Sequence, residues 1–344
     1  MHRARYCLFL IGYVAALATI CSCCQRPGQY RETSGAIWAT TYHIVYKSPV
    51  SLDDSIIKVF ESVDKSLSPF NPASRMSEIN RGASNMTDSL FRKVFTTSRE
   101  VNLVSGGLFD PTVAPLVNLW GFGYRNAGHT PDSSEIASAL SLVGIDRCSI
   151  TCDTLCRPDN RMEFNFSAIT KGYACDLVGD MLSRHGCSDF MVEIGGEITV
   201  AGMNPYGEPW HIMIDAPIES DTSVVHSRLA IVAITDCGMA TSGNYRNFHS
   251  TDSGSIGHTI NPRTGYPALR STTLSATVIA PETILADALA TACMVMQPDS
   301  AIRMIEGMEG TSVLLVTEGK DKEWMIRTSS HFPSIKASTP QANK

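Results

Sequence analysis

The chain has 344 residues, 43% apolar and 18% charged, so it is long enough for one large domain and lacks the composition of a disordered protein. Without the N-terminal segment that carries Arg3 and Arg5, 26 of the 28 basic residues remain against 34 acidic ones, a net charge of −8. A chain this acidic is a poor general binder of nucleic acid, so an anionic ligand has to be held by a metal ion or by backbone amides.

The first residues predict an exported protein. Two arginines precede an apolar run from Leu8 to Ile20, which is typical of a secretory signal and too short for an ordinary transmembrane helix. The sequence Ile20-Cys-Ser-Cys23 resembles a lipobox, so we expect a signal peptide over residues 1–22, a lipid on Cys23 and a tether over residues 23–34. A plain signal peptide or membrane anchor is the alternative. The lipid-anchored protein would face the periplasm or the cell exterior of a bacterium.

The predicted elements follow in chain order. They are a strand over 36–46, helices over 52–66, 88–105 and 133–142, a hairpin formed by 148–156 and 162–166, a helix over 172–185, strands over 190–200, 210–214, 227–235 and 271–279, helices over 282–296 and 300–306, and strands over 311–317 and 323–327. This mixture without regular βαβ alternation predicts an α+β fold, in which helices pack on mixed, largely antiparallel sheets in a single domain over 35–330. A polar tail over 331–344 would follow.

Three cysteines recur every four residues, at Cys148, Cys152 and Cys156. In an exported chain one disulfide among them is plausible. A zinc site is less so, because no histidine lies nearby and the spacing is not CxxC.

Familiar nucleotide motifs are absent: the sequence has no GxxxxGK[ST], no complete GxGxxG after a strand and no GxSxG. Four other clusters carry chemistry. They are the Gly- and Pro-rich stretch 105–123 with Asp110, the segment 165–176 in which Lys171 lies beside a helix start, the hydroxyl- and glycine-rich stretches 241–246 and 257–265 with His258, and the segment 287–291. Taken alone, each is also compatible with an ordinary loop or helix surface.

The last of these clusters indicates a magnesium site. Asp287 and Thr291 are four residues apart on a predicted helix and therefore share a face. A carboxylate and a hydroxyl suit Mg²⁺, which takes few protein oxygens and leaves positions for phosphates and water.

Taken in order, eight motifs resemble the ApbE family, the FAD:protein FMN transferases, over nearly the whole mature chain. They are Trp38-Ala-Thr-Thr-Tyr42, Leu67-Ser-Pro-Phe-Asn71, Gly107-Leu-Phe-Asp-Pro-Thr-Val113, Ala168-Ile-Thr-Lys-Gly-Tyr-Ala-Cys-Asp176, Glu193-Ile-Gly-Gly-Glu197, Thr241-Ser-Gly-Asn-Tyr245, His258-Thr-Ile-Asn-Pro262 and Ala286-Asp-Ala-Leu-Ala-Thr291. The lipoprotein signal also fits this family.

The resemblance implies roles by position. The flavin substrate FAD would contact Trp38, Phe70, Leu108, Phe109, Asp110, Asn165, Lys171 and Ile260. Mg²⁺ would be bound by Ala168 through its carbonyl, by Asp287 and by Thr291, with Ala290 close by. The family usually has methionine, tyrosine and aspartate at the positions of Trp38, Phe70 and Asn165, and some relatives have an acid at that of Ala290. These departures change the flavin edge and the metal shell.

The resemblance also implies a reaction, in which a threonine hydroxyl of an acceptor protein attacks the FMN phosphorus of FAD and AMP leaves. The acceptors would be flavoprotein subunits of membrane redox complexes. Asp287 and His258 are both candidate bases, and the sequence does not choose between them. Two alternatives remain: a FAD pyrophosphatase that releases FMN and AMP, and a flavin-binding lipoprotein without catalysis.

Overall fold

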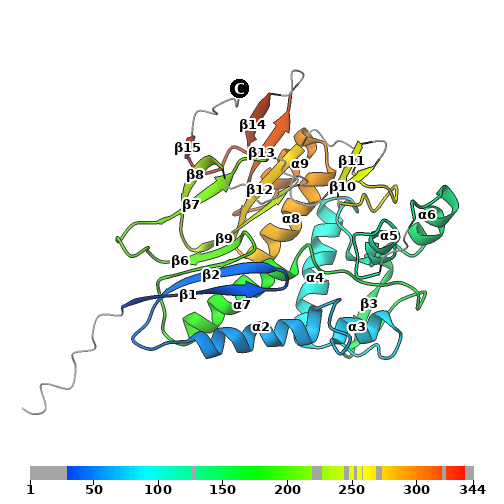
Figure 1. Ribbon diagram of the computed structural model, residues 1–344, viewed down its shortest axis with the longest axis horizontal. Coiled ribbons are helices and arrows are strands. Elements are labelled where there is room, and N and C mark those ends of the chain that lie inside the picture. The colour runs from blue at the N-terminus through cyan, green and yellow to red at the C-terminus, as the bar shows by residue number, and fades with distance from the viewer. Residues whose placement is uncertain are drawn as a thin grey trace, which may run out of the picture.

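A long antiparallel sheet organises the molecule (Figure 1). The computed structural model describes residues 29–125, 129–218, 227–243, 248–251, 254–257, 259–268, 273–319 and 323–337. In spatial order, the strands of this sheet are β1 (Tyr30–Ile37), β2 (Thr40–Lys47), β5 (Phe190–Ile194), β6 (Glu197–Ala201), β9 (Cys237–Gly243), β12 (Thr273–Ala280), β13 (Ser312–Glu318) and β14 (Trp324–Thr328). Each neighbouring pair is antiparallel, as the α+β prediction requires.

A smaller sheet covers one face of this long sheet. Its strands are β15 (Ile335–Ala337), β8 (Arg228–Ile234) and β7 (Trp210–Asp215). Apolar residues that alternate along β7 and β8 pack against Ile198, Val200 and Leu314 of the long sheet to form one hydrophobic core. None of the predicted site residues that the structure describes belongs to this core.

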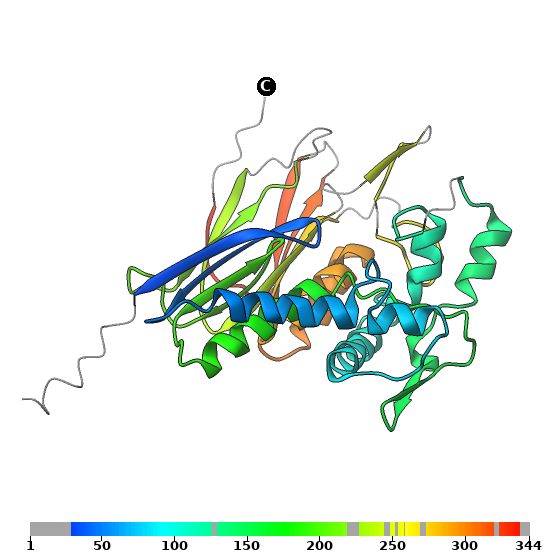
Figure 2. The ribbon, with the colours of Figure 1, turned by 60° about the horizontal axis from the view of Figure 1, so that its bottom comes forward.

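Helices cover the other face. Figures 1 and 2 show α7 (Thr170–Arg184) and α8 (Thr283–Val295) along the sheet, with α2 (Asp53–Leu67) and α4 (Ser89–Val104) outside them. A smaller lobe follows at one end. It contains α3 (Arg75–Asn80), α5 (Ala114–Leu119), α6 (Ser133–Leu140), the 3₁₀ turns η1 (Pro111–Val113) and η2 (Ile145–Arg147), and the short strands β3 (Ser149–Thr151) and β4 (Thr154–Cys156). The remaining elements are α9 (Pro298–Glu306), β10 (Phe248–Thr251) and β11 (Gly254–Gly257). None of the described helices is long and apolar enough to cross a membrane.

The contact between α7 and α8 depends on two residues of α7. Gly172 lies so close to α8 that a Cβ atom there would be 2.4 Å from the Thr283 carbonyl oxygen and 2.8 Å from the Cβ of Asp287. Asp176 accepts hydrogen bonds from the backbone N–H groups of Thr283 and Ile284 at 2.9 and 2.8 Å. These N–H groups belong to the first turn of α8 and have no partner within the helix, so Asp176 caps α8 from a neighbouring helix.

The structure corrects three strand predictions. The predicted strand over 36–46 is the β1–β2 hairpin, whose turn consists of Trp38 and Ala39 with φ of 47° and 61°. The predicted strand over 190–200 is the β5–β6 hairpin, which turns at Gly195 and Gly196. The predicted pairing of 148–156 with 162–166 is wrong, because β3 and β4 pair around a turn inside 148–156 and residues 162–166 form no strand.

The folded domain extends beyond the predicted bounds of 35–330 at both ends. Residues 30–34 belong to β1, where every residue pairs with β2. Residues 335–337 form β15 and pair with β8. Both segments therefore belong to the folded domain, and residues 1–28 and 338–344 lie outside the described residues.

The predicted disulfide is absent, because Cys148, Cys152 and Cys156 are all free thiols. Cys148 is buried and its sulfur faces the Gly144 carbonyl at 3.9 Å, whereas Cys152 lies in the β3–β4 turn with φ of 48°. The turn thus keeps Cys152 at the far end of the hairpin from Cys148.

Candidate functional site

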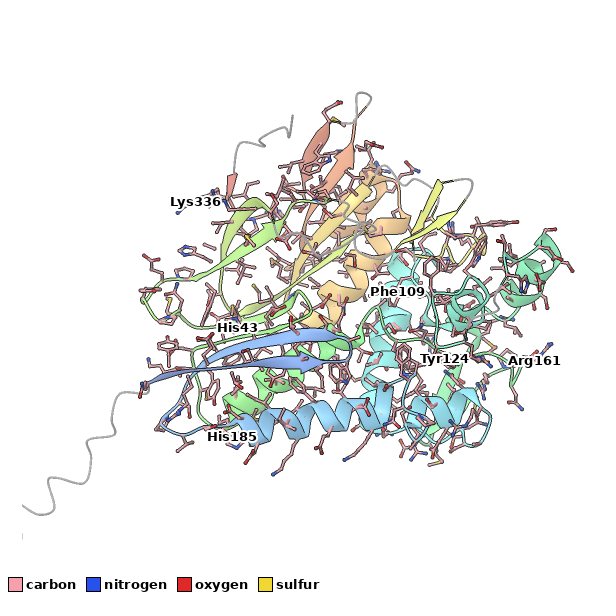
Figure 3. The ribbon with its side chains drawn as sticks, in the orientation of Figure 1. His43, Phe109, Tyr124, Arg161, His185 and Lys336 are labelled. Atoms are coloured by element: carbon pink, nitrogen blue, oxygen red, sulfur yellow. The ribbon has the colours of Figure 1, made fainter. Side chains whose placement is uncertain are left out.

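Most of the predicted site residues line a single cleft with a volume of about 300 Å³. The cleft is bounded by the loop after α2, the loop between α4 and α5, the start of α7, the β5–β6 turn, the end of β9 and the inner side of α8. The predicted residues that line it are Phe70, Leu108, Phe109, Asp110, Asn165, Ala168, Lys171, Ile260, Asp287 and Thr291. Figure 3 labels Phe109 and Tyr124, another residue of this cleft, on the side where α4 and α5 lie.

Asp287 and Thr291 line the cleft one helical turn apart on α8, as the spacing predicts. Asp287 is almost fully buried, and one carboxylate oxygen accepts a hydrogen bond from the Gly172 N–H at 3.0 Å. Burial raises the pKa of Asp287, while the Lys171 charge and the Gly172 N–H oppose this shift. The Thr291 hydroxyl lies 3.3 Å from the Ser242 hydroxyl of β9. The cleft thus has a cluster of oxygen atoms at its α8 wall.

Lys171 brings a positive charge to the same wall. Its Nζ lies 2.8 Å from Oε1 of Glu197, the first residue of β6, and both residues line the cleft. Burial alone would lower the pKa of Lys171, but the negative charges of Asp287 and Glu197 raise it above the ordinary value. Lys171 is therefore a fixed cation in this cleft at neutral pH.

Trp38 and Phe70 line a second cavity of about 520 Å³, which shares Phe70 and Lys171 with the first. Phe70 is 72% exposed, although a phenylalanine gains free energy when its ring is covered. Trp38 lines this second cavity and packs edge-on against Phe60, with ring centroids 5.6 Å apart. An exposed aromatic ring beside a fixed cation suits a ligand that joins a flat ring to a phosphate.

Asp110 lines the cleft and is held there by hydrogen bonds. Its carboxylate accepts hydrogen bonds from the backbone N–H groups of Thr112 at 2.8 Å and Ile145 at 3.0 Å, and from the Thr112 hydroxyl at 2.5 Å. Burial raises the pKa of Asp110, and these hydrogen bonds oppose the shift. The side chain therefore fixes the loop that carries Leu108 and Phe109.

The remaining predicted residues are placed as follows. Asn165 lines the cleft, but its side-chain oxygen accepts the Ser167 N–H at 2.9 Å. Ile260 is buried at the cleft wall. Ala290 is fully buried in the main core and is not among the residues that line the cleft. His258 and the proposed lipid site Cys23 lie outside the described residues.

Two residues of the cleft, Glu197 and Ser242, were not singled out from the sequence. Both belong to the motifs of the resemblance, but their positions in the sequence do not indicate that Glu197 contacts Lys171 or that Ser242 contacts Thr291. Glu197 meets Lys171 only because α7 packs on the β5–β6 hairpin, and Ser242 meets Thr291 only because α8 packs on β9. Contacts between elements so far apart in the chain carry no local sequence signal.

Comparisons with known proteins identify the family. The family model described as the ApbE family matches residues 38–315. The chain belongs to the ApbE family. It is 32% identical to the FAD:protein FMN transferase of Vibrio cholerae over 94% of this chain and 99% of that protein. It is 30% identical to the Haemophilus influenzae protein of the same name, over 94% of this chain and 97% of that protein.

Solved structures of the family share the fold. The flavin transferase ApbE from Vibrio cholerae matches with a TM-score of 0.77 and 30% identity, over 88% of this chain and 98% of that chain. The apo form of the Pseudomonas stutzeri flavinyl transferase ApbE matches with a TM-score of 0.79 and 29% identity, over 89% of this chain and 96% of that chain. The predicted family and fold class are thereby confirmed.

Proposed function

We propose that the protein transfers the FMN half of FAD to a threonine hydroxyl of an acceptor protein and releases AMP, with Mg²⁺ as cofactor. The observation that carries this proposal is that Asp287, Thr291 and Lys171 line the same cleft as the exposed ring of Phe70. The names of the relatives supply the substrate and the product class.

The donor set fits Mg²⁺. A buried carboxylate, two hydroxyls and the backbone at Ala168 offer oxygen ligands, and the described residues bring together no group of three or more His, Cys, Asp or Glu side chains. Mg²⁺ binds through one or two carboxylates plus substrate phosphates and water, whereas a structural zinc site needs four protein ligands. When bound, the metal would neutralise charge that develops on the pyrophosphate.

The protein's own residues would position the substrate. Phe70 offers a face for the isoalloxazine ring, and Lys171 offers a cation for the phosphates. Asp110 would act indirectly, because it holds the Leu108–Phe109 loop that forms the opposite wall. The pyrophosphate would lie between Lys171 and the Asp287–Thr291 pair, where the acceptor hydroxyl attacks the phosphorus on the FMN side.

Incubation with FAD, Mg²⁺ and a candidate acceptor domain tests the proposal. Flavin fluorescence that stays on the acceptor after denaturation supports transfer, whereas free FMN and AMP without labelled acceptor would establish a pyrophosphatase instead. Asp287→Ala should abolish turnover and retain part of the FAD binding. Unchanged turnover in this variant would remove Asp287 from the metal site.

We further propose that the protein is exported and held on a bacterial membrane by a lipid on Cys23. The arginines, the apolar run and the cysteine at the end of the signal support this proposal. Labelling with an alkyne-bearing fatty acid tests it: the wild-type protein should take up the label and Cys23→Ser should not. A labelled Cys23→Ser variant would move the anchor to another cysteine.

A further inference from the structure

The Lys171–Glu197 pair leaves one polar atom without a partner. Glu197 has only 5% of its side chain exposed, and Oε1 pairs with Lys171 at 2.8 Å. Its other oxygen, Oε2, is buried and accepts no hydrogen bond from the described part of the chain. A buried carboxylate oxygen without a donor destabilises a fold. Stability alone is therefore a poor reason for a glutamate at this position.

The position of the lysine suggests a reason. Lys171 interacts electrostatically with both Glu197 and Asp287, yet within the described residues its only ion pair is with Glu197. Asp287 instead accepts a hydrogen bond from the N–H of Gly172, the residue after Lys171. Without the charge of Glu197, the ammonium would keep Asp287 as the other carboxylate that acts on it. An ammonium paired with Asp287 would compete with a cation for the same oxygens.

We propose that Glu197 is a positioning residue that holds the Lys171 ammonium away from Asp287 and so keeps this carboxylate available for the divalent cation. The inference rests on the proposed magnesium site. It assigns Glu197 an indirect role, since the glutamate acts on the metal through the lysine. It also explains how the lysine, which suits the substrate phosphates, can lie near Asp287 without forming an ion pair with it.

Manganese binding tests the inference without any turnover. Mn²⁺ serves as a probe of the magnesium site, and its free concentration is followed by the electron paramagnetic resonance signal of the hydrated ion. Glu197→Gln keeps the shape of the side chain and should weaken Mn²⁺ binding by about tenfold, which corresponds to 1.4 kcal/mol. Lys171→Met in the wild-type background should change the affinity by less than about threefold, because the paired lysine does not compete.

The double variant separates this mechanism from a simple change of charge. In the Glu197→Gln background, Lys171→Met should recover most of the lost affinity, about tenfold, because the competing ammonium is gone. If the two charges act independently on the metal, Lys171→Met should change the Mn²⁺ affinity by the same factor in both backgrounds. This result would overturn the inference. The circular dichroism spectrum of Glu197→Gln should match that of the wild type, which separates a loss of Mn²⁺ affinity from unfolding.

Two further results keep the inference apart from the proposed function. Asp287→Ala should abolish Mn²⁺ binding, and if the wild-type protein binds no Mn²⁺ or Asp287→Ala binds it normally, the magnesium site itself is wrong. If binding depends on Asp287 but Glu197→Gln binds as tightly as the wild type, the magnesium site stands and the role of Glu197 is refuted.

Discussion

Replacement of Gly172 by alanine should disable the site through the packing of two helices. The added Cβ would lie 2.4 Å from the Thr283 carbonyl oxygen and 2.8 Å from the Cβ of Asp287, whereas ordinary contacts begin at 3.4 Å. The start of α7 and α8 must therefore separate by about 1 Å, and such overpacking costs about 1–3 kcal/mol of unfolding free energy. The same shift moves Asp287, and a 1 Å error in a catalytic group lowers a rate by about 100-fold.

Two measurements on purified Gly172→Ala check this reasoning: the free energy of unfolding from urea titration, and the rate of FMN transfer from FAD. Gly307→Ala is the matched control, because a Cβ there would meet nothing nearer than 3.4 Å and its φ is −79°. It should keep wild-type activity. If Gly172→Ala matches the wild type in both stability and rate, the close contact between α7 and α8 does not position Asp287.

Three further predictions concern stability and flavin binding. Burial raises the pKa of Asp176 from 3.8 to about 6, so the folded protein binds more protons than the unfolded chain between these values. The free energy of unfolding of the wild type, relative to that of Asp176→Asn, should therefore be greatest near pH 4. It should fall by up to about 3 kcal/mol as pH rises to 7. Urea titrations that give the same difference at every pH would contradict this. Phe70→Ala should weaken FAD binding by about tenfold in fluorescence titrations. It should leave the free energy of unfolding within about 0.5 kcal/mol of the wild type, because the ring is largely exposed. Phe70→Tyr is the control and should bind FAD like the wild type. Ala39→Gly should raise the free energy of unfolding by up to about 1 kcal/mol, because a φ of 61° strains alanine but not glycine. A lower melting temperature in this variant would show that the turn is not strained at Ala39.

The sequence predicts those parts of the fold whose signals are local. Helices α2, α4 and α8 show their apolar spacing and begin within a few residues of the predicted positions. The β1–β2 turn escaped prediction because Trp38 and Ala39 are not turn-forming residues, and the left-handed backbone there depends on the pairing of the strands on both sides.

The sequence predicts only part of the candidate site, for the same reason. Asp287 and Thr291 share one face of a helix, so their spacing alone brings them together. The position of Phe70 came from the family resemblance. Neither the spacing nor the resemblance predicts that Glu197 pairs with Lys171, because the two residues belong to elements that meet only in the folded protein.

If the proposed lipid on Cys23 anchors the protein, the β1–β2 hairpin limits how far the second cavity can lie from the membrane. Its first strand has eight residues and therefore spans about 26 Å, from Tyr30 to the turn that carries Trp38 at the second cavity. With a lipid on Cys23, the residues before Tyr30 add at most about 25 Å in full extension. The second cavity would then be confined within about 50 Å of the bilayer surface, so only acceptors whose target threonine lies in that shell could be modified without leaving the membrane.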